Sequence, residues 1–172
     1  MFHLLLGRRA LLAAALALAT TSAVCAEPPA HSPACTSGAA GQAELKPLQP
    51  LTLVTEKGRF DFKVEDAAND RTREIGLMCR TRLGSDRGML FDFVQPTQGV
   101  AFWMKNTLIP LDIVFIRPDG TVISIARDAR PLDETPLDAG GTVRGVLELA
   151  GGRAAEIGLR PGDKVVHGIF PR

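Results

Sequence analysis

The segment that most constrains the fold is "LDIVFIRPDGTVISIARD", residues 111–128. Two runs rich in apolar and β-branched residues flank the tetrapeptide "RPDG". Pro118 presets the backbone for a turn, and Gly120 can adopt the positive φ that a tight turn requires. Short runs of this kind on either side of a turn are typical of a β-hairpin. The segment therefore predicts a chain that is built mainly from short strands.

The chain from residue 51 onward repeats this pattern of short apolar runs and turns. A second hairpin is expected in "LTLVTEKGRFDFKVED", residues 51–66, where alternate apolar side chains share a face. Two short helices are expected, one in "AANDRTREIGLM" with Asn69 or Asp70 as its N-cap and Gly76 at its end, and one in "GRAAEIG". Further strands are expected in "GMLFDFV", "VAFWMKN", "TVRGVLELA" and "DKVVHGIF".

These elements amount to about eight short strands and two short helices. The polar stretch 128–141 is expected to form a long loop. Because no long amphipathic helix is present, βαβ winding is not expected. The order of elements predicts a mainly β fold, either an antiparallel β-sandwich or a partly closed barrel.

Residues 1–26 have the form of a secretory signal peptide. Arg8 and Arg9 precede an apolar run, and Val24 and Ala26 suit a cleavage site. The apolar run is shorter than the roughly 20 residues that cross a bilayer comfortably. We therefore expect a periplasmic or secreted protein that contacts the membrane only through the uncleaved signal. The arginine pair leaves both general secretion and twin-arginine export open.

Residues 27–50 are rich in Pro, Ala, Ser and Gly and predict a disordered linker, which leaves 51–172 as a single domain. Two cysteines, Cys35 and Cys79, remain after the expected cleavage. In an oxidising compartment they can form one disulfide, which would fasten the linker to the domain. The alternative is a buried Cys79 and a loose Cys35.

Charge and histidine content argue against several functional classes. The chain has 20 basic and 19 acidic residues, and removing the two arginines of the signal leaves 18 against 19. A nearly neutral domain offers no electrostatic basis for nucleic-acid binding. Only His31 and His167 remain after cleavage, and no zinc-ligand spacing, nucleophile elbow or phosphate loop is present. No cofactor or metal is therefore expected.

Polar residues interrupt the most apolar part of the chain, "AFWMKNTLIPLDIVF", residues 101–115. On a strand, Trp103 and Lys105 would point to one side of the sheet. Asp112 lies within a run that should be partly buried, and a buried carboxylate needs partners. Glu148 in "VLEL" poses the same problem.

Two interpretations of these polar residues stay open. One is a structural ion-pair network, in which cationic or amide side chains satisfy the buried carboxylates. The other is a small-ligand pocket that is floored by apolar side chains and carries convergent polar groups. The candidate ligand-binding residues are Arg80, Trp103, Lys105, Asn106, Asp112 and Glu148.

Three long blocks resemble the DUF192 family in amino-acid sequence and in their order along the chain: "EIGLMCRTRLGSDRGMLFDF", "FWMKNTLIPLDIVFIRPDG" and "GVLELAGGRAAEIGLRPGD". The resemblance extends from about Leu51 to the C-terminus. It implies a compact, mainly β domain that often carries an export signal and has no assigned activity. Cys79 departs from the family pattern, in which a large residue tends to stand, and this departure slightly favours a local disulfide. The matching positions are Gly76, Leu77, Met78, Arg80, Gly88 to Phe91, Phe102 to Thr107, Pro110 to Asp112, Glu148, Gly162 and Asp163.

Three functional hypotheses follow from these residues. The leading one is a non-enzymatic β domain that binds a small polar ligand or a protein partner. The second is an enzyme that uses Asp112 and Glu148 as acid and base on a carbohydrate, which needs both carboxylates about 5–10 Å apart in one cleft. The third is Cu(I) binding by Met78, Met89 and Met104, against the alternative that these methionines only pack the core.

Overall fold

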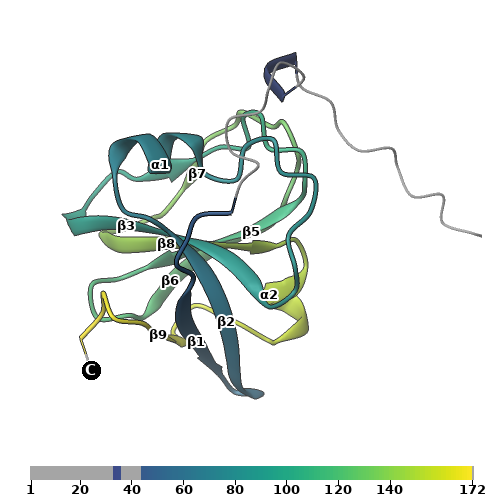
Figure 1. The fold of residues 1–172 in the computed structure, drawn as a ribbon. Helices are drawn as coiled ribbons and strands as arrows, with labels where there is room; N and C mark the ends of the chain where they lie inside the picture. Colours follow the sequence, from purple (N-terminus) through teal and green to yellow (C-terminus); the bar gives the residue numbers. More distant parts are fainter. Residues whose placement is uncertain (1–32, 36–43, 172) are drawn as a thin grey trace, which may run out of the picture.

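The computed structural model describes residues 33–35 and 44–171. The expected signal peptide and most of the expected linker lie outside these ranges. No helix in the described ranges is long and apolar enough to cross a membrane. The elements, drawn in Figure 1, are a 3-10 helix (Pro33–Cys35), β1 (Gln49–Thr55), β2 (Gly58–Ala67), α1 (Asp70–Ile75), β3 (Arg87–Thr97), β4 (Ala101–Phe102), β5 (Leu111–Ile116), β6 (Val122–Ala129), β7 (Leu137–Asp138), β8 (Val143–Ala150), α2 (Arg153–Glu156) and β9 (Lys164–Val166).

Seven strands form one curled sheet in the order β6-β5-β8-β3-β2-β1-β9, and β4 pairs with β7 in a separate two-stranded ribbon. A bridge between Thr121 and Lys164 brings the two ends of the large sheet together. The backbone N–H groups of Val122 and Val165 reinforce this closure by donating to Asp163 and Gly120. The mainly β, partly closed architecture that the sequence predicts is confirmed.

Both expected hairpins are present. β1 and β2 pair from Gln49 opposite Val64 to Thr55 opposite Gly58. β5 and β6 are joined by the turn that contains Gly120, whose φ is 78°. A Cβ atom at Gly120 would lie 2.8 Å from the carbonyl oxygen of Val165, so the turn needs glycine for its backbone angle and for this close approach.

The strand pairs are antiparallel, as expected, with one exception that the sequence did not indicate: β2 and β3 pair in parallel. The crossover between them is residues 68–86 and contains only the short α1. A crossover needs a dozen or more residues, which this segment supplies without a long helix. α1 itself follows the expected cap, because Asn69 and Thr72 exchange hydrogen bonds in a capping box.

The strand expected in "VAFWMKN" is reduced to the two residues of β4, and the expected long loop contains its partner β7. After β4 the backbone N–H of Met104 donates to the carbonyl oxygen of Asp133, and Asn106 adopts a positive φ of 54°. The chain from Trp103 to Asn106 is therefore an irregular segment at the edge of the domain. This irregular course decides where the side chains of Trp103 and Lys105 lie.

The middle strands of the large sheet are buried on both faces, which explains why apolar residues occupy successive positions in them and not only alternate ones. Val114, Leu147 and Leu149 belong to a first core inside the barrel, which α2 helps to cover. Their sequence neighbours on the other face belong to a second core, beneath α1 and β4. Figure 1 shows α1 and β7 on the same side of the curled sheet.

Candidate functional site

A hollow opens above the second core, between α1 and the segment that follows β4. Its volume is about 540 Å³. One wall consists of α1 residues and 76–78, the other of residues 101–103 and 105–107, and Phe91 and Glu148 lie between them. A second hollow of about 370 Å³ shares Phe91 and Phe102 with the first and continues along residues 99–102. We call the two together the α1–β4 groove.

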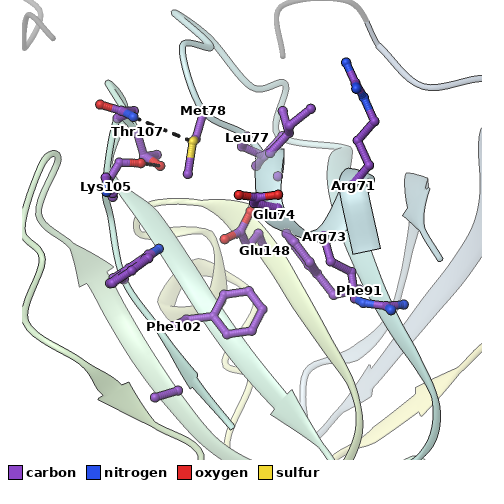
Figure 2. A pocket seen from close by; sticks show the side chains of 15 residues that line it. Arg71, Arg73, Glu74, Leu77, Met78, Phe91, Phe102, Lys105, Thr107 and Glu148 are labelled. Carbon is purple, nitrogen blue, oxygen red and sulfur yellow. Dashed lines mark hydrogen bonds between the residues drawn. The ribbon is translucent and has the colours of Figure 1, made fainter. Parts of the chain in front are cut away.

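Glu148 lies at the floor of this groove. Its position in β8 is opposite Met89 of β3 and Ile113 of β5, both of which belong to the second core. Its side chain is 5% exposed, and its Oε2 atom is buried without a hydrogen-bond partner among the described residues. Figure 2 shows its carboxyl group between Leu77 and Arg73 on one side and Phe102 and Lys105 on the other. A buried polar group with no protein partner is thus directed into an open cavity.

Burial among apolar neighbours raises the pKa of Glu148 to about 8. The charged carboxylate is disfavoured because nothing replaces the water that it loses. The side chain is therefore largely protonated at neutral pH, and it can donate one hydrogen bond and accept others. A ligand group in the groove would meet a neutral carboxylic acid.

Positive charge predominates around the opening of the groove. Arg71 and Arg73 of α1 line one wall and Lys105 the other, against the single carboxylate of Glu74. Arg73 is already engaged, because it pairs with Asp70 at 2.5 Å. The salt bridges of the described ranges include neither Arg71 nor Lys105. Two exposed cations therefore line opposite walls of the groove.

Trp103 and Lys105 lie on the same wall, on one side of the chain as the sequence predicts. The indole of Trp103 is 51% exposed, and the Nζ atom of Lys105 lies 5.4 Å from the centre of its ring. The intervening Met104 points into the second core and is 1% exposed. An exposed aromatic ring beside a cation is a common element of ligand sites. The structure thus brings Trp103, Lys105, Asn106 and Glu148 together.

One end of the groove is fastened by contacts between its two walls. The backbone N–H of Cys79 donates to the carbonyl oxygen of Asn106 at 2.8 Å, and the amide of Asn106 donates to the sulfur of Met78 at 3.9 Å. The second contact is the dashed line in Figure 2. Cys35 forms a disulfide with Cys79, with their Cα atoms 5.1 Å apart. The disulfide therefore lies directly behind the closed end of the groove.

Two of the predicted site residues lie elsewhere. Arg80 does not line the groove, and its guanidinium pairs with the buried carboxylate of Glu65 at 2.8 Å. Asp112 is fully buried on the opposite face of the sheet from Glu148, and its two oxygens accept hydrogen bonds from the N–H groups of Asp128 and Ala154. The acid–base pair of Asp112 and Glu148 is not formed, because adjacent positions on neighbouring strands point to opposite faces.

The three methionines occupy two different environments. Met89 and Met104 are 1% exposed in the second core, whereas Met78 lines the groove and accepts the Asn106 hydrogen bond. Residues 33–35 and 44–171 contain no cluster of three or more His, Cys, Asp or Glu side chains that could hold a metal ion. The burial of Met89 and Met104 supports the interpretation that these residues pack the core.

The wall that α1 supplies was missed at the level of sequence. Arg71, Glu74 and Met78 are spaced by three and four residues, so they follow one side of a helix and of its continuation. This spacing can be read from the sequence alone and indicates that the three side chains share a face. It did not identify a site, since only the parallel crossover places α1 opposite β4.

Comparisons with known proteins support the family and the fold. The DUF192 family model, described as "Uncharacterized ACR, COG1430", matches residues 52–167. A crystal structure of a proposed transcription regulator from Sinorhizobium meliloti 1021 is 38% identical, with a TM-score of 0.70 over 76% of this chain and 100% of that one. A protein of unknown function from Novosphingobium aromaticivorans DSM 12444 is 42% identical, with a TM-score of 0.68 over 80% of this chain and 99% of that one. No curated protein matches the chain.

Proposed function

The chain belongs to the DUF192 family, and from this premise we propose that it is an exported binding protein whose α1–β4 groove holds an amphipathic, anionic ligand. The ligand would place its anionic group between Arg71 and Lys105. A neutral polar group would reach the carboxylic acid of Glu148, and apolar parts would pack against Trp103 and Phe102. Each of these side chains lines the same hollow.

The observation that carries this proposal is the buried Oε2 atom of Glu148, which has no hydrogen-bond partner among the described residues. Leaving a buried polar group without a hydrogen bond costs about 1–3 kcal/mol. A side chain such as methionine would fill the same space without this cost. A bound ligand that hydrogen-bonds to Glu148 would remove this cost. Ligands that can form this hydrogen bond would therefore bind more tightly than ligands of similar shape that cannot.

The disulfide between Cys35 and Cys79 supports the export part of the proposal. Disulfides persist mainly in oxidising compartments such as the periplasm and the extracellular space. The arrangement also suits a binding protein, because the bond holds Cys79 where its N–H contacts the Asn106 carbonyl at the closed end of the groove.

We do not extend the description of the Sinorhizobium meliloti protein to this chain. Binding of nucleic acid depends on contacts between phosphates and clustered cations. Here 20 basic residues are balanced by 19 acidic ones. Three of the cations line a hollow whose floor holds the neutral Glu148 among apolar side chains, which favours a small or narrow ligand over a phosphate backbone.

The proposal is tested by a thermal-shift screen of the purified protein against organic acids, acidic and basic peptides, sugars and nucleotides. A ligand that binds only the folded state raises the melting temperature. The shift should be large for wild type, smaller for Glu148→Gln, which keeps a polar side chain, and absent for Glu148→Met. The matched control is Glu134→Gln, because Glu134 is exposed and lies outside the groove.

Two results would count against the proposal. One is a library in which no compound shifts the melting temperature of wild type. The other is a compound that shifts Glu148→Met and wild type equally, because that ligand would bind somewhere other than the floor of the groove.

A further inference from the structure

We infer that the ligand of the α1–β4 groove is an extended acidic peptide, which adds as a third strand to the free edge of β4. This inference rests on the proposed function, since it names the ligand class of the same groove. Four observations carry it: unpaired backbone groups on β4, the side on which the groove lies, the charges of its walls and the neutral state of its floor.

The backbone of β4 has one edge without a partner. Within residues 33–35 and 44–171, β4 pairs only with β7, with Ala101 opposite Asp138. The N–H of Ala139 donates to the carbonyl oxygen of Val100 at 3.0 Å, which makes Val100 and Ala139 a hydrogen-bonded pair. Because such pairs alternate along an antiparallel ladder, the N–H and C=O of Ala101 point away from β7. Among the described residues no hydrogen bond to either group is present.

The groove lies on this free side. Both hollows are lined by β4 residues, and neither is lined by Leu137 or Asp138 of β7. The opposite wall is α1, so a strand added to β4 would lie between a helix and a sheet edge. Peptides are commonly held in this way, because the edge supplies main-chain hydrogen bonds and the adjacent hollows receive alternate side chains.

The charges specify what kind of peptide fits. Arg71 and Lys105 line opposite walls of the groove without salt bridges among the described residues, and Arg73 adds a third cation. Of the described residues on the walls, Glu74 alone carries a negative charge that opposes them. A peptide with carboxylate side chains would be attracted along its length, whereas a basic peptide would be repelled.

The floor is compatible with such a peptide. A charged Glu148 would repel a carboxylate that entered the hollow, but a protonated Glu148 can donate a hydrogen bond to it. A small organic acid would satisfy the cations and Glu148 equally well, yet it would leave the backbone edge of β4 unused. The unpaired edge is therefore what distinguishes a peptide from other anions.

The first test uses synthetic hexapeptides, acetylated and amidated, with the sequences Val-Glu-Val-Glu-Val-Glu and Val-Lys-Val-Lys-Val-Lys. We expect the acidic peptide to bind at least tenfold more tightly in isothermal titration calorimetry. N-methylation of the three valines and of the three glutamates should have unequal effects, because an added strand uses the N–H groups of alternate residues. Equal effects of the two methylations would overturn the inference.

The second test changes the protein. Ala101→Pro removes the N–H from the free edge of β4 without removing a bond to β7, and should weaken the acidic peptide about five- to tenfold. The matched control is Asp138→Pro, which makes the same change on the far edge of β7, outside the groove, and should leave the affinity within twofold. Circular dichroism and the melting temperature of each variant establish that it is folded.

Glutarate, a small dicarboxylate, distinguishes failure of the peptide inference from failure of the proposed function. If glutarate raises the melting temperature of wild type but not of Glu148→Met, and the peptide does not bind, the peptide inference fails and the proposed function stands. If the peptide binds equally to wild type and folded Ala101→Pro, the strand-addition geometry is overturned. If neither probe binds and the wider screen is empty, the proposed function fails as well.

Discussion

Asp112 and Glu148 are two buried carboxyl groups on neighbouring strands, and they differ in their hydrogen bonding. Asp112 of β5 is opposite Leu149, one position from the pair that joins Ile113 to Glu148. Asp112 faces the first core, where it accepts hydrogen bonds of 2.8 Å and 2.6 Å from two backbone N–H groups. Glu148 faces the second core and the groove, and its Oε2 atom accepts none from the described residues.

The difference separates a structural carboxylate from a candidate functional one. Asp112 links β5 to the start of α2 and to the end of β6, so backbone N–H groups replace the hydrogen bonds to water that its carboxylate loses on burial. Glu148 lies between Met89 and Ile113, whose side chains carry no hydrogen-bond donor. Burial alone therefore does not identify a site. The informative observation is a buried polar group whose partner is absent and whose surroundings leave room for one.

The largest effect is expected at Asp112. Asp112→Ala should lower the free energy of unfolding by about 3–5 kcal/mol, because it leaves the N–H groups of Ala154 and Asp128 without an acceptor. Urea denaturation measures the change. Asp112→Asn is the graded comparison, since its single amide oxygen can serve one of the two donors, and it should cost less. A loss below about 1 kcal/mol for Asp112→Ala would show that the linkage is not structural.

The pH dependence of stability should come next in size. The pKa of Glu148 is raised from 4.5 to about 8 on folding, so the folded protein holds a proton that the unfolded chain has released between these values. Stability should therefore fall as the pH rises through this window and level off above it. Relative to Glu148→Gln, wild type should lose about 3 kcal/mol between pH 5 and pH 7.5. Parallel stability profiles for the two proteins would contradict the assignment.

A smaller effect of opposite sign is expected when Glu148 is made apolar. At pH 4, where Glu148 is largely protonated in both the folded and the unfolded chain, Glu148→Met should raise the free energy of unfolding by about 1–2 kcal/mol, because it removes an unsatisfied buried group at similar volume. The same substitution should abolish ligand binding. Thermal denaturation with and without the best ligand measures both. A destabilised Glu148→Met would indicate that Glu148 has a structural partner after all.

The smallest effect on stability is expected at Trp103. Its indole is 51% exposed, so Trp103→Ala should change the free energy of unfolding by no more than about 0.5 kcal/mol. Ligand affinity should nevertheless fall, because the ring forms part of the wall beside Lys105. Isothermal titration of wild type and the variant provides the measurement. A stability loss above 2 kcal/mol would mark Trp103 as a packing residue instead.

Local sequence was a good guide to single elements. The turn with Pro118 and Gly120, the Asn69 cap and the paired runs of β1 and β2 each depend on residues close together in the chain. The parallel pairing of β2 and β3 was not foreseen, because a crossover of irregular loop and short helix carries no periodic signal. The shortening of the strand after Val100 was also missed, since it follows from the ribbon that β4 forms with β7.

The sequence by itself determined that this is a mainly β chain, and that charged and aromatic residues interrupt its most apolar strands. It also predicted that Trp103 and Lys105 share a side, and the structure places both on one wall of the groove, although the chain there is irregular and not a strand. The tertiary structure decided which polar residues have partners. Arg80 forms an ion pair with Glu65, and Asp112 accepts hydrogen bonds from two N–H groups. The Oε2 atom of Glu148 has no partner among the described residues. Hydrogen-bond satisfaction depends on atoms that folding brings from distant segments, and no pattern of nearby residues encodes it.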